Sequence, residues 1–218
     1  MESTVQRTAR ALRKLEDENP DFVEIRFDAM KSTHSISEIR DATDRALIAT
    51  NRSSGQGGFF SGTEEMRIET LTRAAESAFE YVDVELITKD VTKTVRQLKQ
   101  HGAGVIVSYH NRKGTPAQRA LESILEREKR AGGDICKIVG TAKKYADSLR
   151  CLTFVNKHAR RTKLVCFSMG RLGIPSRVLS PIFGAYFTFA SFRPGRETAA
   201  GQIPIDSLRA LYKELGVV

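Results

Sequence analysis

Short apolar runs alternate with longer amphipathic stretches along the whole chain. The short runs are rich in Val, Ile and Phe. Several of them lack the regular polar alternation of a half-exposed strand, which is typical of parallel strands covered by helices. These runs predict seven strands, over Phe22–Phe27, Ala46–Thr50, Tyr81–Leu86, Gly104–Tyr109, Ile135–Val139, Lys163–Ser168 and Ala185–Phe189.

The amphipathic stretches predict helices between these strands. The clearest signals belong to Pro116–Arg130, because Thr115 and Gln118 match a capping box, proline suits the first helical position, and Gly132-Gly133 follow the end. Further helices are predicted over Thr4–Glu18, Glu64–Glu80, Val91–Gln100, Ala142–Ala159 and Ile205–Leu215, with shorter ones over Ile36–Thr43 and Ser176–Ile182.

Strand and helix repeat in units of about 25–30 residues, which is the rhythm of βαβ folds. Two architectures share this rhythm, an open doubly wound sheet and a closed (β/α)8 barrel. No GxGxxG segment follows the first strand, and Gly55-Gln56-Gly57-Gly58 lacks the Lys-Ser/Thr of a phosphate loop. Seven strands are one fewer than a barrel needs, and the chain opens with a helix where a barrel places its first strand.

Composition narrows the class of protein. The chain has 218 residues, 40% apolar and 28% charged, which fits one domain with a full core. No apolar run approaches the ~20 residues that span a bilayer, and the N-terminus has no segment like a secretion signal. We therefore expect a cytoplasmic protein without membrane association. Three cysteines without a CxxC pair argue against a disulfide scaffold or a zinc site and predict buried reduced thiols, at Cys136, Cys151 and Cys166.

The net charge of +9 is compatible with two kinds of partner. A basic surface can bind nucleic acid, or it can draw a small anionic substrate into a positive cleft. The basic clusters are Arg112-Lys113, Lys143-Lys144 and Arg160-Arg161-Thr162-Lys163, and no aromatic-rich binding motif lies among them. They predict solvated faces and no nucleic-acid partner.

Chemically active side chains gather at the ends of the predicted strands. In a barrel, the carboxyl ends of the strands converge on one mouth, where active sites lie. Period two places Glu24, Arg26 and Asp28 on one face of the first strand, and Asp83 with Glu85 on one face of the third. The other strand-end candidates are Arg52, His110, Met169 and Arg177.

Lys137 stands inside an apolar strand, where a lysine must lie at an edge, snorkel to the surface or point into a polar cavity. Burial and nearby cations disfavour the charged ammonium, which leaves the amine able to act as a nucleophile. A structural role is the commoner one for such a lysine, and also for a lone histidine such as His110. Together, one strand apart, they indicate a nucleophile with a proton carrier.

Three of the remaining candidates keep structural alternatives open. Glu24 and Arg26 could form an ion pair that fills the end of a barrel, or they could contact a substrate. Arg177 could be an ordinary arginine on a helix surface, or it could clamp a carboxylate through two hydrogen bonds if it faces the mouth.

With these residues, the chain resembles the type I 3-dehydroquinate dehydratases, a Schiff-base-forming family of the shikimate pathway. The similarity runs in order from about Phe22 to Val218. The segments that carry it are Glu24-Ile25-Arg26-Phe27-Asp28, Thr50-Asn51-Arg52 with Gly57-Gly58, Asp83-Val84-Glu85-Leu86, Ser108-Tyr109-His110 with Thr115-Pro116, Lys137-Ile138, Ser168-Met169-Gly170 with Gly173 and Ser176-Arg177, Phe183-Gly184 with Thr188-Phe189, and Ala200-Gly201-Gln202.

The resemblance implies a (β/α)8 TIM barrel, one domain over residues 1–218, with the first strand short or missing. It implies that Lys137 forms an imine with the C3 ketone of 3-dehydroquinate, and that His110 removes the C2 proton and helps to expel the C1 hydroxyl. It implies no metal and no organic cofactor, and a homodimer is the habit of the family. The implied substrate-binding residues are Arg177 and Gln202 for the carboxylate, Glu24, Arg26 and Arg52 for the hydroxyls, Met169 and Phe189 as pocket lining, and Thr198 in the closing loop.

The chain departs from the family pattern at two positions. Gln56 stands where a glutamate usually precedes the Gly-Gly pair, so it would not raise the pKa of the histidine as a carboxylate does, and Asp83 or Glu85 could compensate. Thr198 stands for a serine in the closing loop, over Ser191–Gln202, which could act as a lid. Two other functions stay open, a class I aldolase on the same barrel and a barrel that binds an anion or nucleic acid without catalysis.

Overall fold

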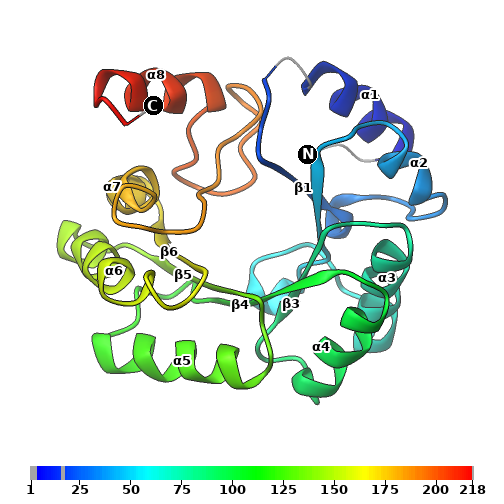
Figure 1. Ribbon diagram of the computed structural model, residues 1–218, viewed down its shortest axis with the longest axis horizontal. Helices are drawn as coiled ribbons and strands as arrows, with labels where there is room; N and C mark the ends of the chain where they lie inside the picture. The colour runs from blue at the N-terminus through cyan, green and yellow to red at the C-terminus, as the bar shows by residue number, and fades with distance from the viewer. Residues whose placement is uncertain (1–3, 16–17, 218) are drawn as a thin grey trace. The chain divides into compact units, whose positions relative to one another are not determined.

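The computed structural model describes residues 4–15 and 18–217, which form two compact units. The first unit contains Met1–Ser108 and Glu128–Asp134, and the second contains Tyr109–Arg127 and Ile135–Val218. In the described part of the chain, six strands follow the order β1-β2-β3-β4-β5-β6, with helices between them (Figure 1). The pairings within each unit are parallel. The alternation of strand and helix is therefore confirmed.

The first unit is built on four strands, whose register separates two kinds of side chain. One row across the strands, Ile25, Ala49, Val82 and Val105, is apolar and buried. The next row begins with Arg26, Thr50 and Asp83, so a polar face lies opposite the apolar one. The strands are β1 (Phe22–Arg26), β2 (Ala46–Thr50), β3 (Tyr81–Glu85) and β4 (Gly104–His110), whose last two residues belong to the second unit.

Helices cover the strands of the first unit. α3 (Glu64–Glu76) contacts β2, β3 and α4 (Val91–Gln100), and both helices turn buried residues toward the strands. α1 (Val5–Leu15) packs on α2 (Ser37–Arg40) through Val5, Thr8 and Leu12, which recur at helical spacing. The short 3-10 turns are η1 (Phe27–Ala29) and η2 (Ser54–Gln56).

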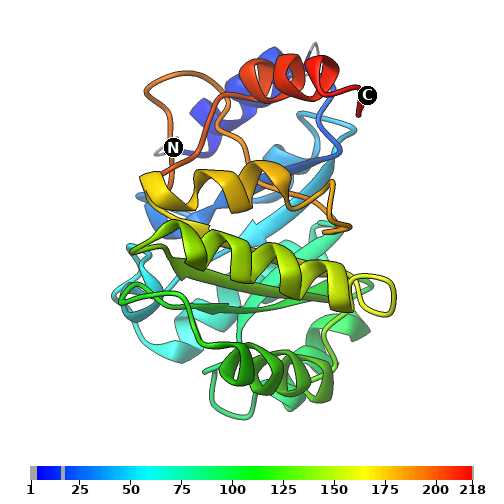
Figure 2. The ribbon, with the colours of Figure 1, turned by 90° about the vertical axis from the view of Figure 1, so that its left-hand side faces the viewer.

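The second unit pairs β5 (Ile135–Thr141) with β6 (Leu164–Met169). Lys137, Val139 and Thr141 lie level with Val165, Phe167 and Met169, so these six side chains share one face. α6 (Tyr145–His158) and α7 (Ile174–Leu179) lie side by side and both contact β6 (Figure 2). The remaining elements are α5 (Gln118–Arg130), η3 (Arg171–Gly173) and α8 (Ile205–Glu214).

The predicted seventh strand, Ala185–Phe189, is wrong, because these residues form no regular strand. Only one backbone hydrogen bond ties the segment to β6, from Tyr186 N to Leu164 O at 2.8 Å. A run of aromatic and small residues has the local propensity of a strand, but a strand exists only where a ladder of hydrogen bonds forms.

The predicted capping box at Thr115 is also wrong. Helix α5 begins at Gln118, and the Thr115 hydroxyl contacts Ser168 Oγ at 2.7 Å and Thr141 O at 3.2 Å instead. The helix predicted over Thr4–Glu18 is observed as Val5–Leu15. Positions 16–17 of the predicted helix lie outside the described residues. In the part of the chain that is described, no helix is long and apolar enough to cross a membrane.

Candidate active site

Arg26 and Asp28 form a bidentate ion pair on the polar face of the first unit. Arg26 Nε donates to Asp28 Oδ1 at 2.8 Å, and Nη2 donates to Oδ2 at 2.7 Å. Burial by itself would raise the pKa of Asp28, but the hydrogen bonds and charge of Arg26 outweigh burial and lower the pKa. Glu24 accepts a hydrogen bond from Thr50 Oγ1 at 2.9 Å. Arg26 thus takes Asp28, rather than Glu24, as its bidentate partner.

Arg52 is buried in a network of ionised and hydroxyl side chains. Its Nη2 lies 2.8 Å from Asp83 Oδ2, and its Nη1 lies 3.5 Å from Glu85 Oε1. Nη1 also donates to Ser108 Oγ at 2.8 Å, and that hydroxyl donates to Asp83 Oδ1 at 2.6 Å. Asp83 and Glu85, the two carboxylates expected to replace the charge missing at Gln56, therefore hold Arg52.

The Gly57-Gly58 pair shapes the turn that follows Arg52. Gly57 has φ +87°, which favours glycine. A Cβ at Gly58 would lie 2.0 Å from the Arg52 carbonyl oxygen, so a larger residue cannot fit there. Phe59 N donates to Asp28 Oδ2 at 3.0 Å, and Ser53 Oγ donates to Glu85 Oε2 at 2.7 Å. The glycines thus serve a close backbone approach beside the carboxylates.

Lys137 is the central charged residue of the second unit. It lies in the middle of β5, paired level with Val165, and is only 3% exposed. The amine lies 4.3 Å from the centroid of the Phe189 ring. The edge and snorkelling interpretations require an exposed ammonium, so the burial of Lys137 favours the third one, a lysine that points into an enclosed site.

A backbone hydrogen bond places His110 on the same strand face as Lys137. Asn111 N donates to Val139 O at 2.8 Å. In a parallel pair this bond sets Asn111 level with Gly140, and therefore His110 level with Val139. Val139 and Lys137 are two residues apart and share a face. The half-buried imidazole and the buried amine thus lie on one face, one strand and two residues apart.

Arg177 is buried, which rules out the interpretation as an ordinary surface arginine. It is 2% exposed although it lies in helix α7. Its guanidinium carbon lies 4.2 Å from the centroid of Phe167, and its Nη1 donates to Phe189 O at 3.5 Å. Because Phe167 shares the strand face with Lys137 and Met169, Arg177 is held against that face.

Thr198 and Gln202 are bonded to each other in the closing loop. Gln202 Oε1 accepts hydrogen bonds from Thr198 N at 2.7 Å and Thr198 Oγ1 at 3.2 Å. Gly170 N donates to Ala200 O at 3.0 Å, and a Cβ at Gly201 would lie 2.7 Å from Gly170 O. The loop is therefore fixed next to the carboxyl end of β6, where Met169 lies.

A chain of small hydroxyls behind this face holds the turn that leads to Arg177. Ser176 Oγ donates to Gly173 O at 2.7 Å and accepts from Ser168 N at 3.0 Å. Thr115 Oγ1 lies 2.7 Å from Ser168 Oγ. The sequence pattern predicts no role for these hydroxyls. The available signal was a serine at the end of an otherwise apolar strand.

The three cysteines form no disulfide and are buried, as predicted. Cys136 and Cys166 lie on the strand face opposite Lys137. A hydrogen bond from Cys166 lowers the pKa of Cys151, against the effect of burial. Among the described residues, no group of three His, Cys, Asp or Glu side chains is placed to hold a metal ion.

Parallel strands that alternate with helices are typical of (β/α) barrels, and a buried lysine on the strand face that also bears a strand-end histidine is an arrangement that suits an enzyme site. The family model for type I 3-dehydroquinase matches residues 1–218. A 3-dehydroquinate dehydratase from Methanothermobacter thermautotrophicus is 37% identical over 204 residues, 91% of this chain and 87% of that protein. Another, from Dehalococcoides mccartyi, is 32% identical over 207 residues, 95% of this chain and 90% of that protein.

The chain therefore belongs to the type I 3-dehydroquinase family, whose members are lyases of the shikimate pathway. Solved structures with the same fold include two 3-dehydroquinate dehydratases. The 3-dehydroquinate dehydratase of Geobacillus kaustophilus has a TM-score of 0.90 and 25% identity, covering 97% of this chain and 87% of that chain. The type I enzyme of Clostridium difficile, solved with covalent modified comenic acid, has a TM-score of 0.88 at 24% identity, covering 98% and 89%. These matches confirm the predicted TIM-barrel fold.

Proposed function

We propose that this chain converts 3-dehydroquinate into 3-dehydroshikimate through an imine on Lys137, with His110 as the acid and base. The observation that carries the proposal is the burial of the Lys137 amine on the strand face that also bears His110. A lysine amine is a nucleophile for a ketone carbonyl, and a histidine on the same face can carry the protons of that reaction.

The reaction balances without a cofactor. Lys137 Nζ adds to the C3 ketone and one water leaves, so that a protonated imine forms. The imine withdraws electrons, and His110 can then take the C2 proton. The electrons of that C–H bond form the C1–C2 double bond as the C1 hydroxyl leaves as water, protonated by His110. One water then hydrolyses the imine, which restores the lysine and releases the enone.

The carboxylate of the substrate gives Arg177 and Gln202 their proposed roles. Arg177 is held by Phe167 and by the Phe189 carbonyl, so its guanidinium is ordered before substrate arrives. An ordered fork loses little entropy when it binds a carboxylate. Thr198 orients the Gln202 amide through the two hydrogen bonds to its oxygen, which leaves the amide nitrogen as the donor. Met169 and Phe189 would line the pocket that binds the substrate.

Glu24, Arg26 and Arg52 belong to the proposal as residues that bind the substrate hydroxyls. Each of them also holds a partner inside the first unit, namely Thr50, Asp28 and Asp83 respectively. An experiment that substitutes one of these residues must therefore measure substrate binding and protein stability separately. The proposal further includes a single domain over residues 1–218, a cytoplasmic location and a homodimer. The family model that matches the full length supports the single domain.

Borohydride trapping tests the proposed imine directly. Purified protein is mixed with 3-dehydroquinate, the absorbance of the conjugated enone is followed, and borohydride is then added. We expect turnover, inactivation by borohydride only when substrate is present, and a reduced adduct on Lys137 by peptide mass spectrometry. The absence of both turnover and adduct would falsify the proposal.

The same experiment separates the alternatives. A class I aldolase would give a lysine adduct with its own substrate and products of fewer carbon atoms, without the enone. A barrel that only binds an anion would give neither adduct nor enone, and binding would weaken steeply with salt whether or not Lys137 is present.

A further inference from the structure

The basic run Arg160-Arg161-Thr162-Lys163 surrounds a pocket. The sequence predicted a solvated face for this run, but α6 ends at His158 and the run forms the turn before β6 (Figure 2). The cavity has a volume of 290 Å³. The lining residues are Ala159, Arg160, Arg161, Thr162, Lys163, Gly184 and Tyr186.

Backbone contacts also fix the part of this pocket that Gly184 and Tyr186 line. Gly184 has φ +100°, and a Cβ there would lie 3.2 Å from the Cβ of Ala159, so this turn comes close to the end of α6. Two residues later, Tyr186 N donates to Leu164 O at 2.8 Å. The Tyr186 ring then lies 4.9 Å from Lys163 Nζ. The pocket is therefore held by the fold as well as by long side chains.

The two arginines that line the pocket differ from the cations that precede them in the chain. No lining residue is acidic. Among the residues that the structure describes, the exposed side chains of Arg160 and Arg161 make no ion pair or hydrogen bond. The cations just before them differ, because Lys157 and His158 lie 2.8 and 2.9 Å from Glu122 carboxylate oxygens. The two arginines are therefore available to a ligand.

We propose that this pocket binds a small phosphate-bearing anion. Two guanidinium forks and an ammonium around one concavity match a compact group with several negative charges and several acceptor oxygens, and the Thr162 hydroxyl adds a donor. The pocket lies at the start of β6, and Met169 lies at the end of this strand. A rise of ~3.3 Å per residue places these two ends about 20 Å apart. It is therefore separate from the candidate active site.

Titration calorimetry with inorganic pyrophosphate, and with phosphate, at constant ionic strength tests this site. We expect saturable binding that is at least tenfold weaker in Arg160→Gln/Arg161→Gln. We expect unchanged binding in Arg96→Gln, which removes an exposed arginine of α4 outside the pocket. Amide shifts on pyrophosphate addition should concentrate at Thr162 and Gly184. Circular dichroism and turnover of 3-dehydroquinate report whether each variant is folded, and both single variants are measured as well.

Three results would overturn the proposal. Equal weakening in Arg96→Gln, or binding that follows ionic strength alone, would show diffuse attraction to a basic protein. Benzoate binding as tightly as pyrophosphate would remove the phosphate assignment. A single-stranded oligonucleotide that binds more tightly than pyrophosphate, with shifts spread beyond the pocket, would assign the arginines to nucleic acid. None of these results depends on whether Lys137 forms an imine.

Discussion

In the first unit, the arginines of the polar strand face are paired with carboxylates, whereas in the second unit Lys137 and Arg177 lie on aromatic rings. Arg26 holds Asp28, and Arg52 holds Asp83. Lys137 lies over Phe189, and Arg177 over Phe167. An ion pair ties two charged groups together, while the face of a ring orders the side chain above it and shields that side chain from water. We infer that the first face chiefly stabilises the fold and that the second performs the chemistry.

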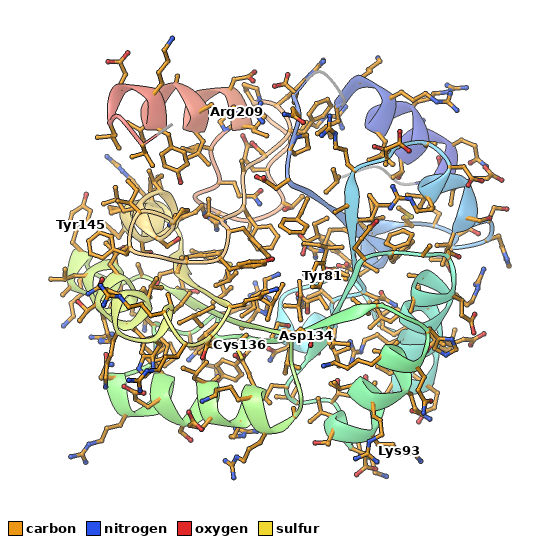
Figure 3. The ribbon with its side chains drawn as sticks, viewed as in Figure 1. Tyr81, Lys93, Asp134, Cys136, Tyr145 and Arg209 are labelled. Carbon is orange, nitrogen blue, oxygen red and sulfur yellow. The ribbon has the colours of Figure 1, made fainter. Side chains whose placement is uncertain are left out.

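The largest effect expected from this comparison is the loss of activity in Lys137→Met. Methionine is close to lysine in volume and suits a buried position, so the variant should stay folded. Without the amine, turnover of 3-dehydroquinate and the borohydride adduct should both disappear. Lys93→Met, an exposed substitution on α4 (Figure 3), is the control and should retain full turnover. Retained turnover in Lys137→Met would contradict the role of the second face.

His110→Ala should lower turnover by about 10²–10⁴-fold, because proton transfer by a positioned side chain contributes a factor of that order. The amine remains in this variant, so the borohydride adduct should still form. Single-turnover kinetics and peptide mass spectrometry measure the two steps separately. An unchanged rate would remove His110 from the mechanism, and a lost adduct would give it a role in imine formation.

Asp83→Asn tests the first face. The change removes the charge of the 2.8 Å partner of Arg52 and leaves Glu85 at 3.5 Å, so the free energy of unfolding should fall by up to the ~3–5 kcal/mol of a broken buried pair. Asp134→Asn (Figure 3) is the control, because the Lys99–Asp134 pair is 38% and 40% exposed and its loss should cost under ~1 kcal/mol, while the asparagine oxygen can still accept from Val105 N. Urea unfolding measures both variants. Equal values would show that the first face does not carry the stability ascribed to it.

Arg177→Gln should reduce kcat/KM by about 10–150-fold, which corresponds to the ~1.5–3 kcal/mol of a hydrogen bond to a charged group. Arg177→Lys should restore little, since an ammonium cannot form the two parallel bonds of a guanidinium. Steady-state kinetics on the intact substrate provide the measurement. If the lysine variant behaved as the wild type, a bidentate contact would be excluded.

Tyr212→Phe should have the smallest effect, because it removes one hydrogen bond to a backbone carbonyl and no charged side chain. Tyr212 Oη donates to Val178 O at 2.7 Å, and burial raises the pKa of Tyr212 from 10.0 to about 12. A raised folded pKa gives stability that is complete below pH 10 and is lost as the pH rises through about 12. Phenylalanine should cost about 1 kcal/mol below pH 10 and should flatten the alkaline decline, as urea unfolding across pH would show. A decline of the same steepness in the variant would assign it to other groups.

Much of the fold follows from local patterns in the chain. Six of the seven predicted strands occur, and α4 has the predicted bounds, because hydrophobic periodicity is a short-range signal. The predictions that failed depend on contacts with residues elsewhere in the chain. Ala185–Phe189 lacks a ladder, and Thr115 bonds Ser168, 53 residues away, instead of capping its own helix.

The candidate site divides in the same way. Lys137 could be found from the sequence, because a charged residue inside an apolar strand is a local conflict that calls for an explanation. The choice between a surface and a buried Arg177 could not, because it depends on Phe167 and Phe189 from other segments. The substrate-binding roles of Glu24, Arg26 and Arg52 stay predictions.

By itself, the sequence determined the order of strands and helices and the presence of a lysine and a histidine at successive strands. The tertiary structure alone decided the register that brings these two to one face, and the carboxylates or rings that each cation contacts. The physical reason is that periodicity and capping act over a few residues. Register and partner choice depend on groups far apart in the chain, whose contacts form only when the strands and helices pack.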